Sequence, residues 1–236
     1  MISLTPLEID ALLLSLRVGV WSLVICLPTG LLIALILARC QFPGKWLLDG
    51  VVHLPLVLPP VVIGYALLIL LGRRGIIGGW LYENFDITLA FTWQGAAVAS
   101  AVMALPLMVR AIRLSLEAMD RGLEAAARTL GASDARVFVT ITLPLCLPGI
   151  LTGCILAFAR SLGEFGATIT FVSNIPGETQ TLPLALFAEI QVPGDATPAI
   201  RLAVISVVVA LFALLASAYL ARRVAQRVGI DKELRR

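Results

Sequence analysis

Charged residues are scarce in this sequence, and their scarcity excludes several classes of protein. Asp, Glu, Lys and Arg make up 14% of the 236 residues, whereas a soluble domain carries about 25%. Hydrophobic residues make up 59%, and they form continuous runs rather than the alternation of a transmembrane β-strand. These features exclude a soluble enzyme, a disordered chain and a nucleic-acid-binding module. They predict an all-α protein that lies in the lipid bilayer.

Residues that bind metals or form disulfides are also few. The chain has a single histidine, His53, and four cysteines without a CxxC pair. We therefore expect no metal site and no bound cofactor in this chain. His53 is expected to be a structural residue. Buried, reduced thiols are expected at Cys26, Cys40, Cys146 and Cys154.

Long runs without acidic or basic residues predict five membrane spans. About 20 helical residues cover the ~30 Å hydrocarbon core, and each run is at least that long. The fourth span is placed near 147–171, because Pro144 and Pro148 interrupt the start of its run. Residues 182–190, inside an outer loop at about 173–200, are too few to span and predict a short outer or half-inserted helix. The spans are 18–38, 50–72, 87–109, 147–171 and 202–221.

The basic residues near the span ends predict the orientation, because Lys and Arg gather on the cytoplasmic side of membrane proteins. With the N-terminus outside, thirteen basic residues lie inside and three lie outside or at the outer edge. We therefore expect the N-terminus outside and the C-terminus in the cytoplasm. The outer three are Arg73, Arg74 and Arg201; the inner ones are Arg39, Lys45, Arg110, Arg113, Arg121, Arg128, Arg136, Arg222, Arg223, Arg227, Lys232, Arg235 and Arg236.

The inner segment at about 111–145 has the most specific local pattern. Its richness in Ala, Leu, Glu and Arg predicts a helix over 114–130. Gly131 suits a left-handed helix exit. Ser133 is placed to cap a second short helix with Asp134 in its first turn, and this helix is expected to end before Pro144.

This segment resembles the EAA loop of ABC-transporter permeases. The run E-A-A-A-R-T-L-G ends at Gly131, and I-T-L-P follows after nine residues. The family glutamate, six residues before the glycine, falls on Ala125, and Glu124 stands one place earlier. Either Glu124 acts from a shifted position, or this carboxylate is dispensable. The residues expected to couple to an ATPase are Glu124, Ala125, Ala126, Ala127, Leu130, Gly131, Ala132, Ile141, Leu143 and Pro144.

Most of the chain also resembles the molybdate branch of these permeases. The resemblance implies a type I ABC importer permease with one domain over 1–236, in the bacterial inner membrane. It implies a homodimer that forms the molybdate pathway, a cytoplasmic ABC ATPase dimer and an external oxyanion-binding protein. ATP and magnesium would be used by the ATPase, which agrees with the lack of a GxxxxGK[ST] loop here. The matching segments are 53–65, 72–78, 104–117, 158–183 and 191–203.

Three alternatives remain at this stage. One is a related permease for sulfate, thiosulfate or tungstate. Another is an ATP-independent channel or carrier, which inverted repeats would favour, and the sequence shows none. The third is a membrane-embedded enzyme, for which the sequence offers too few reactive groups.

Two charged residues and two prolines inside the predicted spans are candidates for the pathway. Arg160 and Glu164 are four residues apart, so they can pair on one helix face, and Thr168 continues that face. A charge at the bilayer centre costs at least ~2.5–3.5 kcal/mol. Arg160 either attracts a passing dianion or braces the helix through Glu164. Pro59 and Pro60 are expected to bend or break the second span, which is then either a pore-lining or gate element or a static kink.

Small residues recur every four positions in the fourth span. Such spacing lets two helices approach closely, and we expect plain helix packing from it. These residues are Gly149, Gly153, Ala157 and Ser161.

Overall fold

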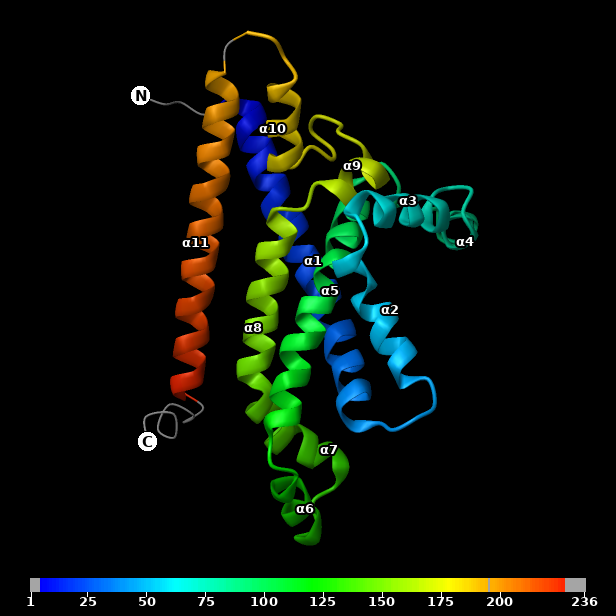
Figure 1. Cartoon of the computed structure of the whole chain (residues 1–236), viewed down its shortest axis with the longest axis vertical. Helices are drawn as coiled ribbons and strands as arrows, with labels where there is room; N and C mark the ends of the chain where they lie inside the picture. The colour runs from blue at the N-terminus through cyan, green and yellow to red at the C-terminus, as the bar shows by residue number, and fades with distance from the viewer. Residues whose placement is uncertain (1–4, 195, 228–236) are drawn as a thin grey trace.

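The structure is a computed structural model that describes residues 5–194 and 196–227, and all regular secondary structure in these residues is helical (Figure 1). Four helices run along the long axis of the molecule, and seven shorter helices and one π-helical turn connect or cover them. The long helices are α1 (Pro6–Arg39), α5 (Trp93–Ala118), α8 (Leu143–Leu162) and α11 (Thr197–Arg227). The shorter elements are α2 (Lys45–Val57), α3 (Pro60–Leu71), α4 (Ile76–Phe85), α6 (Arg121–Thr129), α7 (Asp134–Val137), the π-helical turn η1 (Phe138–Thr142), α9 (Gly166–Val172) and α10 (Leu182–Ile190).

Helices α1, α5 and α8 pack against one another to form the main core. Met108 and Ile112 of α5 are fully buried in this core, together with Cys26 of α1. The small residues of α8 line the contact, and an added Cβ at Gly153 would come 2.7 Å from the Met108 sulfur. The stripe Gly149, Gly153, Ala157 and Ser161 is buried throughout, which confirms its role in helix packing.

The second predicted span is not a straight helix. Its residues form α2 and α3, which meet at an angle of 117° on either side of Leu58 and Pro59. Proline has no backbone N–H and disfavours the helical conformation in the residue before it, so a helix breaks readily at this point. Among the described residues, four helices are long and apolar enough to cross a membrane, and the count reaches five if the bent pair is one broken span.

The helices do not all end where the predicted spans end. Helix α1 contains the predicted span 18–38 and extends before it to Pro6, where Thr5 and Glu8 form a capping box. Helix α8 ends at Leu162 rather than 171, and α9 is a separate short helix. Arg160 and Glu164 therefore do not lie on one continuous helix.

The segment at 111–145 also differs from its prediction in two places. Helix α5 continues to Ala118, and a break at Met119 and Asp120 separates it from α6, so residues 114–130 are not one helix. After α7, the chain passes through η1 directly into α8, so the second helix does not end before Pro144. The π-helical turn widens the helix just before Pro144, which has no N–H to donate.

The nine-residue helix predicted over 182–190 is present as α10, which lies beside α1 and α11 (Figure 1). The Ser15 hydroxyl of α1 accepts a hydrogen bond from the Leu182 N–H at 2.7 Å. Arg201, in the first turns of α11, forms an ion pair with Glu8 in the first turn of α1, with Nε 3.0 Å from Oε1. These contacts hold the first and last helices together at the α10 end of the molecule.

Some expectations concern single residues. Cys26 and Cys146 are buried and Cys154 is partly buried, but Cys40 is exposed, so the expectation of burial is wrong there. His53 Nδ1 lies 2.8 Å from the Asp49 carbonyl oxygen one turn earlier, as expected of a structural residue.

The orientation of the chain in the membrane stays a prediction. Lys232, Arg235 and Arg236, which contribute to it, lie outside the described residues.

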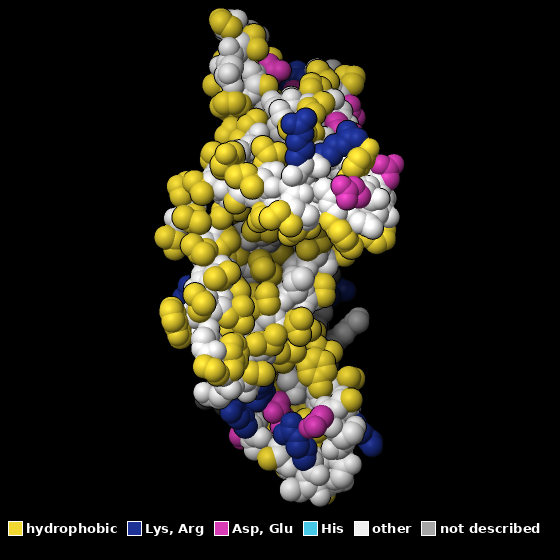
Figure 2. All heavy atoms as spheres, turned by 90° about the vertical axis from the view of Figure 1, so that its right-hand side faces the viewer, with side chains coloured by type: hydrophobic (Ala, Val, Ile, Leu, Met, Phe, Trp, Pro, Cys, Tyr) yellow, Lys and Arg dark blue, Asp and Glu magenta, His cyan; other side chains and the backbone are white. Residues whose placement is uncertain are grey.

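The surface agrees with a protein that crosses a bilayer. Figure 2 shows hydrophobic side chains across the middle of one face, with Lys, Arg, Asp and Glu gathered toward its two ends. Large apolar side chains are widely exposed, among them Val57 at 82% and Phe212 at 74%. A soluble monomer rarely exposes apolar patches on this scale, so lipid or protein must cover them.

Candidate coupling loop and membrane ion pair

Helices α6 and α7 project beyond the ends of α1, α5 and α8 (Figure 1). Asp120 caps α6 by accepting a hydrogen bond from the Gly122 N–H at 2.8 Å. Ser133 caps α7 by accepting one from the Arg136 N–H at 3.4 Å, as the sequence predicted. Between the two helices Gly131 has φ +85°, a left-handed conformation that favours glycine. The projection is a helix, a tight glycine turn and a second helix.

The outermost part of this projection, the Gly131 tip (residues 125–132), has mostly small or apolar side chains and one exposed arginine, Arg128. Ala125 and Ala126 are exposed, and Ala127 and Ala132 are partly buried. Leu130 is 89% exposed. An exposed leucine among small residues can enter an apolar groove of another protein.

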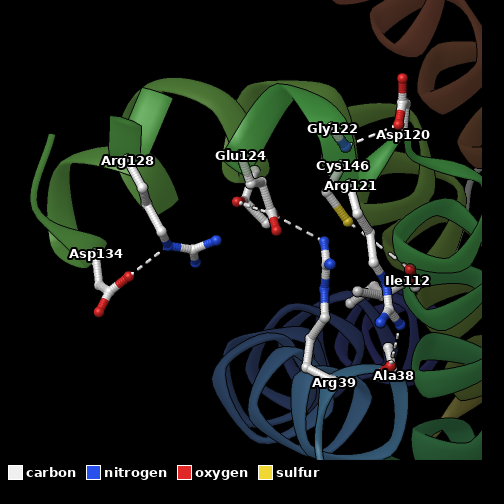
Figure 3. A network of polar contacts seen from close by, with 11 residues as sticks. Ala38, Arg39, Ile112, Asp120, Arg121, Gly122, Glu124, Arg128, Asp134 and Cys146 are labelled. Atoms are coloured by element: carbon white, nitrogen blue, oxygen red, sulfur yellow. Dashed lines mark hydrogen bonds and ion pairs between the residues drawn. The ribbon is translucent and has the colours of Figure 1, made fainter. Parts of the chain in front are cut away.

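Glu124 points away from this surface and into the molecule. Its residue exposure is 7%, although it lies in a solvent-facing helix. One carboxylate oxygen, Oε1, accepts a hydrogen bond from Arg39 Nη2 at 2.8 Å (Figure 3). The same oxygen accepts another from Thr142 Oγ1 at 2.6 Å. Arg39 is the last residue of α1, and Thr142 is the last residue of η1. Glu124 therefore joins α6 to two membrane helices.

Two further arginines of α6 make weaker contacts. Arg128 donates from Nε to Asp134 Oδ1 at 2.8 Å, which links α6 to α7 across the glycine turn (Figure 3). The hydrogen bond that Arg128 donates to Asp134, and the negative charge of that carboxylate, raise the pKa of Arg128, because both favour the protonated form. Arg121 donates to the Ala38 carbonyl oxygen at 3.4 Å.

The remaining motif residues lie closer to the membrane helices than to the tip. Ile141 belongs to η1, and Leu143 and Pro144 begin α8. All three are partly buried. The residues predicted to act together thus divide into an exposed set around Gly131 and a set that forms the root of α8, with Glu124 between them.

The charged pair inside the fourth predicted span is formed. Arg160 Nη1 lies 2.6 Å from Glu164 Oε2, and the side chains are 28% and 1% exposed. The other oxygen of Glu164 accepts a hydrogen bond from the Ala167 N–H at 2.8 Å, so Glu164 also caps α9. Thr168 is buried, and its hydroxyl donates to the Phe165 carbonyl oxygen at 2.9 Å. The structure brings Arg160 and Glu164 together, and it turns Thr168 toward its own helix.

Two helix breaks lie next to each other. Pro59 and Pro60 mark the break between α2 and α3, and Gly163 to Phe165 mark the break between α8 and α9. A Cβ added at Gly166 would come 2.7 Å from the Cβ of Pro60. Pro59 is exposed. The broken parts of the two spans therefore meet close to the Arg160–Glu164 pair.

Residues 28–226 match the family described as the binding-protein-dependent transport system inner membrane component. This chain belongs to that family. It is a multi-pass protein of the bacterial inner membrane and a transporter subunit rather than an enzyme.

Two relatives are similar over nearly their whole length. The molybdenum transport system permease protein ModB of Escherichia coli K12 is 61% identical over 226 residues, covering 96% of this chain and 99% of that protein. The ModB protein of Haemophilus influenzae is 57% identical over 223 residues, covering 94% of this chain and 97% of that protein.

A solved structure confirms the fold of the family. A bacterial ABC transporter involved in the import of alginate matches with a TM-score of 0.74 and 18% identity, over 93% of this chain and 80% of that chain. At this identity the match shows the type I permease fold alone.

Sequence reasoning missed two residues of the Glu124 site. Arg39 and Thr142 lie 85 and 18 positions from Glu124 and contact it only through the packing of α1 against α8. Arg39 did carry a signal, because it is the first basic residue after a long apolar run. No group of His, Cys, Asp and Glu side chains suited to hold a metal occurs within residues 5–194 and 196–227.

Proposed function

We propose that this chain is the molybdate permease subunit of an ATP-driven ABC importer. The observation that carries the proposal is the identity of 61% over 96% of the chain with a molybdenum transport permease. The exposed Gly131 tip supports it, because a permease without its own ATP site needs a rigid surface that a separate ATPase can move.

In this proposal two copies of the chain enclose the pathway. The N-terminus lies outside, the C-terminus lies in the cytoplasm, and an ABC ATPase dimer that uses ATP and magnesium contacts the Gly131 tips. An external oxyanion-binding protein delivers molybdate to the opposite face. Leu130 supplies the apolar contact with the ATPase, and the small alanines allow its surface to approach closely. Gly131 fixes the direction of the turn.

The Arg160–Glu164 pair braces the membrane part of the pathway. Glu164 neutralises the guanidinium at 2.6 Å and caps α9 with its second oxygen. A neutralised arginine attracts a dianion only weakly, so a passing oxyanion is not held. The adjacent helix breaks at Pro59–Pro60 and at Gly163 support a role in lining the pathway, because unwound backbone is tolerated in a membrane where it lines a cavity.

The experiment that tests this function is uptake of labelled molybdate into proteoliposomes. The vesicles contain this chain with its cognate ATPase and binding protein, and uptake is measured with and without ATP and with excess sulfate. We expect uptake that requires all three proteins and ATP and that resists sulfate. Competition by sulfate would instead show that the chain is a permease for a broader set of oxyanions. Competition by tungstate alone would show that the transporter accepts both metal oxyanions. Uptake by the isolated chain without ATP would overturn the proposal in favour of a channel or carrier.

A further inference from the structure

The coupling helix α6 has few means of holding its position. Its first residue follows a non-helical break at Met119 and Asp120, and its last turn leads into the left-handed Gly131. Helical hydrogen bonding is interrupted at both places, so α6 is not a rigid continuation of α5 or α8. A movement of α6 must therefore reach the membrane helices through side-chain contacts.

Two residues of α6 make such contacts. Arg121 donates a long hydrogen bond, at 3.4 Å, to the Ala38 carbonyl oxygen of α1, and Glu124 makes the shorter ones. Among the nine residues of this helix, all within the part of the chain that the structure describes, Glu124 alone is buried. Leu123 beside it is 49% exposed, so apolar packing contributes little on that side. A carboxylate that is buried in an otherwise exposed helix is kept there by its partners, because burial of an unpaired charge is costly.

Its two partners come from the ends of two different membrane helices. Arg39 ends α1, and Thr142 ends the π-helical turn that leads into α8. Both donate to the same oxygen, Arg39 at 2.8 Å (Figure 3) and Thr142 at 2.6 Å. Hydrogen bonds that involve an ionised group are shorter and stronger than neutral ones. Single-turn π-helical segments are often found at functional sites.

We propose that Glu124 is a positioning residue that transmits the movement of α6 to α1 and α8. The proposal rests on the function proposed above, because it assumes that an ATPase moves the Gly131 tip. It assigns Glu124 a role inside the chain, away from the ATPase surface. The position that the family pattern gives to the glutamate is taken here by Ala125, which is exposed, whereas Glu124 one place earlier faces the molecule.

The chain supplies a matched control in the Arg128–Asp134 ion pair. This pair also starts from α6 and also has a distance of 2.8 Å, but it reaches only α7 and is exposed to solvent. Exposed ion pairs contribute little to stability. Loss of Asp134 thus removes a charged contact of the same loop without separating α6 from the membrane helices.

The test measures molybdate taken up per ATP hydrolysed in proteoliposomes of the complete transporter. The variants are Glu124→Ala, Thr142→Val, Thr142→Ser and Asp134→Ala. We expect the ratio to fall about five-fold or more in Glu124→Ala and to fall also in Thr142→Val, which removes only the hydroxyl donor. Thr142→Ser restores that donor and should restore the ratio, and Asp134→Ala should keep the ratio of the unaltered protein.

Two results would overturn the proposal. An unchanged ratio in both Glu124→Ala and Thr142→Val would show that the contact does not transmit movement. Loss of ATPase co-purification in Glu124→Ala with a normal ratio in Thr142→Val would place the carboxylate on the ATPase surface. If Glu124→Ala does not assemble, the Thr142 pair of variants still decides. Absence of ATP-driven molybdate uptake by the unaltered transporter would instead contradict the proposed function, which keeps the two failures apart.

Discussion

The Ser22 hydroxyl of α1 lies 2.5 Å from the Ser161 hydroxyl of α8, and both residues are buried. Each hydroxyl also lies 2.9 Å from a carbonyl oxygen of its own helix, Gly19 for Ser22 and Ala157 for Ser161, so one hydroxyl donates to the other and the second donates to its own helix. The two helices therefore meet through small polar residues at the level of the turn that carries Arg160. This contact leaves no room for a larger side chain.

Substitution Ser161→Leu should destabilise the protein. The added volume enters a packed contact between α1 and α8, and overpacking of this kind costs about 1–3 kcal/mol. Unfolding of the purified protein by a denaturing detergent measures the loss. Thr152→Leu on the exposed side of α8 is the matched control. Equal stability of both variants would show that the contact at Ser161 is looser than the structure describes.

Substitution Gly131→Ala should impair coupling more than folding. A side chain at φ +85° costs about 1 kcal/mol, and the chain relieves this strain by changing the direction of the turn. We expect weaker co-purification of the ATPase and reduced ATP-driven uptake. Gly50→Ala in α2, where an added Cβ meets nothing within 4 Å, should leave both unchanged. Normal uptake by Gly131→Ala would show that coupling does not require the left-handed turn at this residue.

Substitution Leu130→Ser should weaken the binding of the ATPase without lowering stability. Leu130 is 89% exposed, so its loss leaves no cavity inside the chain. A contact residue of this size contributes about 1–2 kcal/mol to an interface, which a pull-down with the purified ATPase can detect. Ile76→Ser in α4 removes a side chain that is 86% exposed, away from the tip, and serves as the control. Equal loss of binding in both variants would show that any exposed apolar side chain has this effect and that Leu130 makes no specific contact with the ATPase.

The Arg160–Glu164 pair can be tested by removing its charges singly and together. Removal of one partner of a buried pair leaves the other uncompensated and costs about 3–5 kcal/mol, whereas removal of both is far less harmful. If the pair only braces the end of α8, Arg160→Gln alone should lose uptake. The double variant, Arg160→Gln with Glu164→Gln, should regain it. Stability and uptake are measured on the same preparations. A double variant that is stable but does not transport would instead assign Arg160 to the attraction of the dianion.

Several features of the fold could be predicted because their causes are local. Gly131, Ser133 and the nine-residue segment 182–190 behave as their sequence neighbours indicate, since turns, caps and short helices depend on a few adjacent residues. The spacing of Gly149, Gly153 and Ala157 likewise identifies a close helix contact, because small residues four apart share one face of a helix.

Other features depend on packing between distant segments and could not be predicted. Prolines at 59 and 60 indicate a break but not its angle of 117°, which is set where α3 lies against α9. The end of α8 at Leu162 has no strong sequence signal, because Gly163 and Gly166 are also common inside membrane helices. The partners of Glu124 come from α1 and η1. The sequence pattern of α6 alone cannot predict them, because they are brought to Glu124 by the packing of other helices.

The ion pair between Glu8 and Arg201 joins residues that are 193 positions apart in the chain. It attaches α11 to α1 independently of the covalent turn at 191–194, and the Ser15–Leu182 hydrogen bond attaches α10 to the same helix α1. The first and last helices of the described chain are therefore in direct contact. A chain cleaved at this turn would keep its last helix in place, and two separately expressed fragments divided there would have the contacts needed to reassemble.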